Sequence, residues 1–325
     1  MSLDADYIVD RRRMRRKLTF WRIFAVILVA LAVIGTTLAL RSPNGFASTP
    51  GPYIARITIE GLIRSDRDRV DALERLGRSS ARAVIVHINS PGGTTGGSEQ
   101  LHDSLKRLKD QKPMVVVVEG LAASGGYIAA LAADHIVAQS SALVGSIGVL
   151  FQYPNFTDLM KTLGVKVEEI KSTPLKAAPS PFEPASPEAR AAVEAIVKDS
   201  YDWFRGLVRD NRKLEGDELA RVTDGRVFTG RQAIDLKLID ELGDEKQALA
   251  WLAKEKGIDP KTRVRNYDLE PRFGDLPFLH VAAAMALDAV GLGAFARRIE
   301  AWGTVRAIER LNLDGLLALW HPSAN

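Results

Sequence analysis

Short apolar runs separated by amphipathic stretches recur along the middle of the chain. Runs such as Met114–Val118 are typical of strands that are buried on both faces of a sheet. The stretches between them place apolar residues three and four positions apart, which predicts helices with one buried face. This alternation predicts an α/β fold with a parallel sheet and right-handed crossovers. The predicted strands are 54–60, 83–89, 114–118 and 135–138, and the predicted helices are 66–76, 97–109 and one that begins at Ser124.

The pattern changes after residue 150. A helix over 156–163 and an alternating strand over 165–170 are predicted first. A long amphipathic helix over 189–211 follows, which we expect to pack on the sheet or on a neighbouring subunit. A further helix over 245–256 carries apolar residues on one face.

The tail from residue 271 onward has apolar patches at 278–290 and 311–320, with arginines between them. Two interpretations stay open for this tail. It packs against the sheet, or its tryptophans and arginines make a peripheral contact with a membrane.

Residues 23–40 form an uninterrupted run without charge, long enough to cross a bilayer at about 1.5 Å per residue. Seven Arg and Lys residues lie between residues 11 and 22, so the positive-inside rule predicts that the segment 1–22 is cytoplasmic. We predict a retained single-pass anchor in a bacterial inner membrane, followed by a linker over 41–53 and a catalytic region in the periplasm. A cleavable signal peptide is the alternative, which the length of the apolar run disfavours.

Composition narrows the chemistry of this chain of 325 residues. The net charge is +4, but the basic residues before the anchor lack a recognised nucleic-acid-binding module, so we predict no nucleic-acid partner. Cysteine is absent, which excludes disulfides, thiolate metal sites and a cysteine nucleophile. No phosphate-binding loop and no cluster with metal-ligand spacing occurs, so we predict no cofactor and no metal.

The strongest candidate for chemistry is Ser124, which stands between the apolar strand 114–118 and a helix of small residues. A serine at such a turn exposes its hydroxyl, and the first N–H groups of the helix lie beside any oxyanion formed there. The glycines Gly125 and Gly126 let a substrate approach the backbone closely. We predict that Ser124 is a nucleophile; an ordinary N-cap serine is the alternative.

A second glycine turn, Pro91–Gly92–Gly93, ends the preceding strand. In an open parallel sheet the carboxyl ends of neighbouring strands form the ligand crevice. The N–H of Gly92 or Gly93 can therefore face the N–H of Gly125 across one carbonyl oxygen, which is the arrangement of an oxyanion hole. Taken singly, each turn is also explained by ordinary turn chemistry.

A base for Ser124 has to be found elsewhere in the chain. Five histidines are present, and none has the context of a Ser-His-Asp triad. A lysine accepts a proton from serine only where apolar surroundings and the lack of a carboxylate partner favour the neutral amine. Lys176 lies in such a segment, whereas Lys171 ends a strand with glutamates close by. We predict Lys176 as the base and keep Lys171 as the alternative.

Five motifs stand in a fixed order along the chain. They are Ile88–Gly93, Ala123–Tyr127, Val144–Val149, the Lys176 loop that ends in Ser180–Pro181, and Asp224–Ala233. In this order they resemble the signal peptide peptidase A group of peptidase family S49, and the resemblance extends over about residues 52–255.

The resemblance implies a crotonase/ClpP-like core of repeated ββα units and a membrane-anchored serine protease with a Ser-Lys dyad. Signal peptides and other apolar peptides are the implied substrates. Carried over by motif, Ser124 is the nucleophile, Lys176 is the general base, and Ser146 is the hydroxyl that orients the lysine, although a turn serine would look the same. A homo-oligomeric ring, an octamer, with active sites shared between protomers is also implied.

The chain lacks the acidic residue that often follows the family's lysine, because Ala177 stands there. No internal repeat is found, so a short, single-repeat member is expected, with a peptidase domain over 54–258 and a helical C-terminal extension over 259–325. A catalytically inactive membrane scaffold and a crotonase-like acyl-CoA enzyme are the alternatives. An external location argues against CoA chemistry, and the presence of both Ser124 and Lys176 argues against a scaffold.

Overall fold

The structure is a computed structural model, and it describes residues 17, 20–22, 24, 51–269 and 316–320. The chain divides into two compact units, 1–51 and 52–325. Of the predicted anchor, only Phe24 belongs to the described residues. Among those residues we find no helix with the length and apolarity that a membrane crossing requires.

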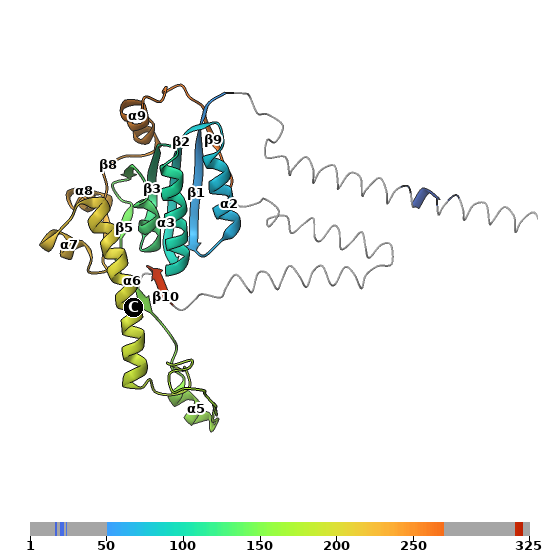
Figure 1. The fold of residues 1–325 in the computed structure, drawn as a ribbon, viewed down its shortest axis with the longest axis vertical. Helices are drawn as coiled ribbons and strands as arrows, with labels where there is room; N and C mark the ends of the chain where they lie inside the picture. The colour runs from blue at the N-terminus through green and yellow to red at the C-terminus, as the bar shows by residue number, and fades with distance from the viewer. Residues whose placement is uncertain (1–16, 18–19, 23, 25–50, 270–315, 321–325) are drawn as a thin grey trace, which may run out of the picture. The chain divides into compact units, whose positions relative to one another are not determined.

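The second unit contains an α/β sheet with its helices (Figure 1). Its described elements are β1 (Tyr53–Ile63), α2 (Arg67–Gly77), β2 (Ala81–Thr94), α3 (Thr95–Lys109), β3 (Met114–Ala123), α4 (Gly125–Ala130), β4 (His135–Ala138), β5 (Leu143–Gly145), β6 (Leu150–Phe151), α5 (Thr157–Leu163), α6 (Pro187–Arg212), α7 (Gly216–Val222), β7 (Val227–Thr229), α8 (Gly230–Asp235), β8 (Glu241–Leu242), α9 (Glu245–Lys256), β9 (Val264–Asn266) and β10 (Leu316–Leu319).

The central part of the sheet is parallel. β1, β2, β3 and β4 pair in this order, β9 joins the outer edge of β1, and β8 joins β4. Successive residues of these strands are buried on both faces, as in Val116 and Val117 of β3, which is expected of parallel strands covered by helices. The predicted α/β sheet is therefore present, and it is mixed, because β7 and β10 pair antiparallel.

β2 and β3 separate near their carboxyl ends. One edge of β2 pairs with β1 along the length of that strand, and its other edge pairs with β3 as far as Ser90 opposite Ala122. From Gly92 to Thr94 this second edge pairs instead with β10, while β3 goes on to pair with β5. Because a strand has only two edges, β10 takes the edge of β2 that β3 leaves. We term this opening, between Gly92–Thr94 of β2 and the end of β3, the fork.

Helices cover both faces of the sheet. α2, α3 and α4 enclose the larger core, where Leu105 and Tyr127 are fully buried. α9 covers the opposite face, where Ala248 and Leu252 pack in one cluster with Ile85 of β2. The sheet thereby holds the carboxyl ends of β2 and β3 in fixed positions.

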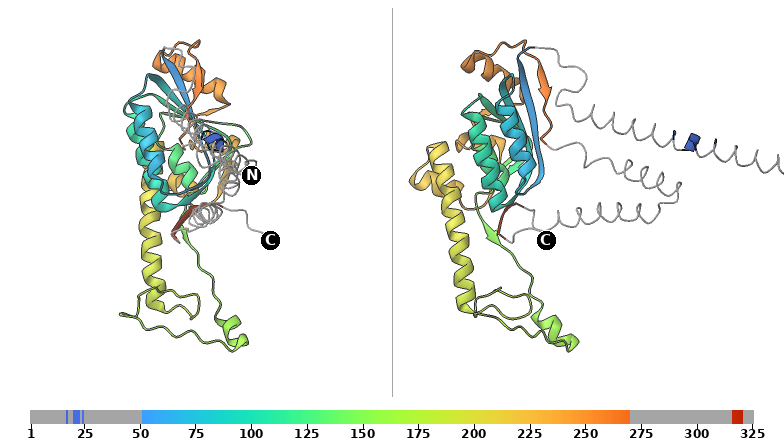
Figure 2. Two further views of the ribbon diagram at one scale, coloured as in Figure 1. Left: turned by 90° about the vertical axis from the view of Figure 1, so that its right-hand side faces the viewer. Right: turned by 45° about the vertical axis from the view of Figure 1, so that its right-hand side comes forward.

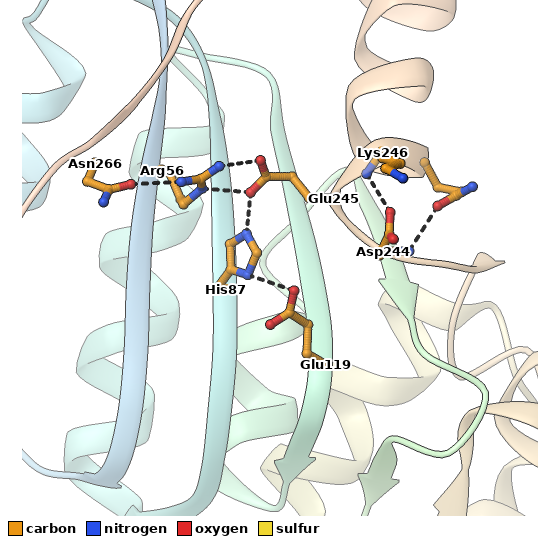
Figure 3. A network of polar contacts seen from close by, with 8 residues as sticks. Arg56, His87, Glu119, Asp244, Glu245, Lys246 and Asn266 are labelled. Atoms are coloured by element: carbon orange, nitrogen blue, oxygen red, sulfur yellow. Dashed lines mark hydrogen bonds and ion pairs between the residues drawn. The ribbon is translucent and has the colours of Figure 1, made fainter.

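A polar network fastens the start of α9 to the sheet (Figure 3). Glu245 accepts a hydrogen bond from Nε of Arg56 at 2.6 Å and lies 2.7 Å from Nε2 of His87. Nδ1 of His87 lies 3.7 Å from Glu119, and Arg56 also donates to Asn266 at 2.9 Å. Burial opposes the ionisation of Glu245, but the hydrogen bonds from Arg56 and His87 outweigh it and lower the pKa of Glu245.

After β6 the chain leaves the sheet and returns along α6. We term residues 152–199 the arm. α5, within the arm, buries none of its residues and lies clear of the sheet in Figures 1 and 2. The prediction of a strand over 165–170 is wrong, because this stretch of the arm has no regular structure. Val165 and Val167 are 48% and 45% exposed, so their alternation finds neither a partner strand nor a core to face.

Candidate active site

Ser124 lies where β3 ends and α4 begins, with φ 53° and ψ −116°. Positive φ is uncommon for a residue with a Cβ, and a strained strand-to-helix turn of this kind presents a nucleophile. The Ser124 N–H donates to the Gly145 carbonyl at 2.7 Å, and its own carbonyl accepts from the N–H groups of Tyr127 and Ile128, each at 2.9 Å. The side chain makes no capping hydrogen bond, so the N-cap interpretation does not explain this serine.

The Ser124 hydroxyl is buried and has no hydrogen-bond partner among the described residues. The whole residue is 0% exposed. A buried hydroxyl without a partner is rare, because the loss of its hydrogen bonds to water is not compensated. Among the described residues, this hydroxyl is therefore free to interact with a bound molecule.

The glycine turn of β2 is held by Ser90, which is fully buried. Its Oγ donates to the Gly61 carbonyl at 2.6 Å and accepts the Gly92 N–H at 3.1 Å. Because the Gly92 N–H is engaged within the turn, the Gly93 N–H is the better oxyanion donor. A Cβ at Gly93 would lie 1.8 Å from the carbonyl oxygen of Ile63, so only glycine fits there.

The two glycine turns are in direct contact. A Cβ on Gly126 would lie 2.6 Å from the carbonyl oxygen of Ser90, so the first turn of α4 packs closely on the turn of β2. Gly125, the first residue of α4, is buried beside it. The structure thus gathers Ser124, Gly125 and Gly93 at the fork.

Ser146 follows β5 and is 8% exposed. It has a φ of 51°, and its N–H donates to the Arg226 carbonyl at 2.8 Å. Its neighbour Gly145 accepts the N–H of Ser124, so Ser146 stands one residue from a backbone contact of the candidate nucleophile. Its role in orienting a lysine stays a prediction.

Neither Ser90 nor Gly145 is distinguished by the sequence as a functional residue. Both lie within the glycine-containing motifs Ile88–Gly93 and Val144–Val149, but their contributions are hydrogen bonds with the backbone. A serine that fixes a turn and a glycine that accepts through its carbonyl leave no distinct residue pattern. Only their position beside the glycine turns was a signal.

The two candidate lysines belong to the arm. Nζ of Lys171 lies 2.7 Å from Glu169 and 2.7 Å from Glu183. Hydrogen bonds to Glu169, which has the larger effect, and to Glu183 raise the pKa of Lys171. Lys171 therefore holds its proton and makes a poor base. Lys176 is exposed, and among the described residues no carboxylate pairs with it. Neither lysine reaches the Ser124 hydroxyl within this chain.

A strained serine at the end of a parallel strand, beside a glycine turn and the first N–H groups of a helix, is the arrangement of a serine hydrolase on an α/β fold. Comparison with known proteins agrees with this class. The sequence profile of peptidase family S49 matches residues 106–259. The chain belongs to peptidase family S49 and is a serine protease of that family.

The relatives carry protease names. A protein of Synechocystis sp. named as a protease is 36% identical over 217 residues, which cover 66% of this chain and 78% of the relative. A protein of Enterococcus faecium named as a signal peptide peptidase SppA is 32% identical over 184 residues, 56% of this chain and 54% of its own length. The chloroplastic serine protease SPPA of Arabidopsis thaliana is 32% identical over 233 residues, 71% of this chain and 33% of its own length. Among solved structures, the chain is similar to a ClpP1 variant from Listeria monocytogenes, with 17% identity and a TM-score of 0.41, over 59% of this chain and 92% of that one.

Proposed function

We propose that the protein is a membrane-anchored serine endopeptidase with a Ser124–Lys176 dyad that degrades signal peptides and other apolar peptides. The observation that carries this proposal is the Ser124 hydroxyl, which is held at a φ of 53°, is buried, and has no hydrogen-bond partner among the described residues. Such an arrangement costs folding free energy and is found where the group has a chemical task. Membership of family S49 supports the peptidase activity.

In the proposed reaction, Oγ of Ser124 attacks the carbonyl carbon of a peptide bond while the neutral amine of Lys176 takes the hydroxyl proton. The N–H groups of Gly93 and Gly125 stabilise the oxyanion that forms. The C–N bond then breaks, and the Lys176 ammonium returns the proton to the leaving amine. Water hydrolyses the Ser124 ester by the same route, which releases the acid and restores the hydroxyl. The hydroxyl of Ser146 orients the lysine amine.

The base in this proposal comes from a second copy of the chain. Lys176 lies on the arm, whose apolar surface is unusually exposed. The large apolar residues of the arm that are at least 40% exposed are Phe156, Leu159, Leu163, Val165, Val167, Ile170, Leu175, Phe182 and Ile196. Apolar surface of this extent is typical of an interface between subunits. A ring of copies, eight by the family resemblance, buries each arm against a neighbour and brings Lys176 of one copy to Ser124 of the next.

A groove beside the fork supports apolar peptides as substrates. It has a volume of about 790 Å³, and its apolar lining includes Phe151, Tyr153, Val193 and Val197. The charged residues Arg190, Glu194, Lys198 and Asp224 line it as well. Phe151 belongs to β6, the strand that borders β10 on the side away from β2. A peptide that enters the fork therefore meets a groove whose apolar residues can hold its apolar side chains.

The membrane location rests on the predicted anchor over 23–40. A catalytic domain tethered at the outer face of a bacterial inner membrane would meet signal peptides that remain there after preprotein cleavage. Protease added to spheroplasts should digest the catalytic domain and leave the basic segment 1–22 intact. A catalytic domain that stays protected would refute this orientation.

A fluorophosphonate probe tests the nucleophile. Full-length protein in detergent should be labelled at Ser124, as located by peptide mass spectrometry, and Ser124→Ala should abolish labelling and peptidase activity. Lys176→Ala should lower kcat by about 10²–10⁴-fold, the usual contribution of a general base. Lys171→Ala is the matched control and should retain most activity. A folded protein that neither reacts with the probe nor cleaves apolar peptides would favour the scaffold alternative.

Mixed oligomers test the shared site. Ser124→Ala and Lys176→Ala chains with different affinity tags, expressed together, should recover part of the activity, because some interfaces then pair an intact serine with an intact lysine. Sequential purification on both tags ensures that the oligomers are mixed. Mixed oligomers without any activity would show that the dyad is not shared between copies.

A further inference from the structure

A segment of the chain itself fills the fork. β10, residues Leu316–Leu319, pairs antiparallel with Gly92–Thr94 of β2 along one edge and with β6 along the other (Figures 1 and 2, red). Beyond the strand, the Trp320 N–H donates to the Pro91 carbonyl at 2.7 Å. An extended segment that joins strand edges through main-chain hydrogen bonds binds in the way that a peptide binds to an exposed sheet edge.

The register of β10 brings its backbone to the candidate oxyanion donor. Hydrogen-bonded and non-hydrogen-bonded pairs alternate along an antiparallel ladder. Since Trp320 bonds to Pro91, the next hydrogen-bonding position is Ala318 opposite Gly93, and the Ala318 carbonyl faces the Gly93 N–H. Gly92, at the intervening position, turns its N–H away from β10, in agreement with its hydrogen bond inside the turn.

Ser124 is inaccessible to solvent in the state in which β10 fills the fork. Ser124 follows β3, and the edge of β2 beside it is the one that β10 occupies. Ser124 is 0% exposed, so no external peptide bond reaches its hydroxyl in this state. Leu317 of β10 is itself 8% exposed, which shows that the segment is packed into the fold.

We propose that residues 316–320 act as a resident pseudosubstrate strand that fills the fork and has to leave before Ser124 reacts. This inference rests on the proposed function, because it assigns a means of regulation to the same site. A tethered segment competes at a high effective concentration, so a free peptide pairs with Gly92–Thr94 only in the fraction of molecules in which the strand is displaced. The apparent affinity for substrate is reduced by that fraction.

Two changes to the tail test this proposal in the full-length protein in detergent. A chain that ends at Asp314 lacks the strand, and Ala318→Pro removes the N–H that points toward β2 at the hydrogen-bonding position. Leu319→Pro is the matched control, because the alternation turns the N–H of Leu319 away from β2. We expect the first two changes to raise kcat/KM for an apolar fluorogenic peptide and the rate of fluorophosphonate labelling by about tenfold or more, and the control to have a smaller effect.

A synthetic peptide of residues 312–325 should inhibit the truncated chain competitively. The same peptide with proline in place of Ala318 should inhibit it more weakly. An unmodified peptide that does not inhibit would overturn the proposal, since the free strand would then have no affinity for the fork.

Hydrogen exchange separates this inference from the proposed function, because it does not depend on catalysis. In a Ser124→Ala background, truncation after Asp314 should increase exchange in the peptides that contain Gly92–Thr94 and β6, while β1 and α9 stay protected as evidence of an intact fold. Faster exchange in a protein that never reacts with the probe would support the resident strand and refute the peptidase. Unchanged exchange together with an unchanged labelling rate would overturn the resident strand and leave the peptidase standing.

Discussion

Substitution of Ser90 by alanine should impair catalysis although Ser90 does not contact the reacting atoms. Its buried Oγ donates to the Gly61 carbonyl at 2.6 Å and accepts the Gly92 N–H at 3.1 Å. Ser90→Ala leaves the buried Gly92 N–H without a partner and removes the hydrogen bond to the exposed Gly61, at a cost of about 1–3 kcal/mol in the free energy of unfolding. For a domain of this size the melting temperature should fall by about 2–4 °C for each kcal/mol.

The effect on activity follows from the freed Gly92 N–H. We expect the turn to rotate without Oγ of Ser90, so that the proposed oxyanion donor, the Gly93 N–H, is misdirected. Removal of one oxyanion donor costs about 10²–10³-fold in kcat, so a misdirected donor should cost about tenfold or more, with little change in KM. Fluorogenic peptide kinetics at a temperature well below both melting points would measure this split.

Ser104→Ala is the matched control for Ser90→Ala. Ser104 is buried, and its Oγ donates to the Gln100 carbonyl at 2.8 Å and accepts from Arg107 at 3.0 Å, both within α3. We expect a loss of stability without a loss of kcat. Equal kcat values for the two variants would refute the view that Ser90 positions the turn.

Four further substitutions follow from the packing and charge of the described residues. Gly93→Ala should prevent folding, because its Cβ would lie 1.8 Å from the Ile63 carbonyl oxygen. Gly206→Ala, whose Cβ meets open space on α6, should instead raise the free energy of unfolding by about 0.5–1 kcal/mol. Equal stability of the two variants in a denaturant titration would contradict this reasoning. Glu245→Gln should cost about 1–2 kcal/mol at neutral pH. Because the fold lowers the pKa of Glu245, the stability that this carboxylate contributes is complete above the ordinary carboxyl pKa of 4.5 and is lost as the pH falls through the lower folded pKa. The melting temperatures of variant and wild type should therefore converge in acid. A difference in melting temperature that does not change with pH would exclude this linkage. Tyr127→Phe removes the hydrogen bond of 2.6 Å to the Leu238 carbonyl and should lower the melting temperature, as measured by calorimetry, with an unchanged value as the contrary result.

The sequence predicts features whose determinants are close together along the chain. The strand, turn and helix around Ser124 follow from one apolar run and the glycines after it. α9 begins and ends where the pattern placed it, because Asp244 and Gln247 form a capping box at its start and Gly257 ends it in the left-handed region. In such cases the signal is local, and the tertiary contacts agree with it.

Features that depend on distant partners could not be predicted in this way. β10 has only four residues, and it is a strand because β2 and β6 offer it their edges. The stretch 165–170 has the alternation of a strand but finds no edge to pair with. The turn-fixing role of Ser90 depends on Gly61, 29 residues away. In the proposed function the base Lys176 comes from a second copy of the chain, and a pattern in one chain does not encode such a relation.

The long helix α6 gives the arm a mechanical property. Its 26 residues span about 39 Å at 1.5 Å per residue, and its second half is held in the core by Phe204 and Val208 while its first half runs out into the arm (Figure 1). A tilt of about 5° around the buried half would displace the other end by about 2 Å, which exceeds the positional tolerance of a catalytic group, about 1 Å. A small rotation of α6 about Phe204 would therefore produce a large displacement at the end of the helix in the arm. In the proposed shared site, packing around Phe204 would therefore tune the rate of the reaction at Ser124 of the neighbouring copy.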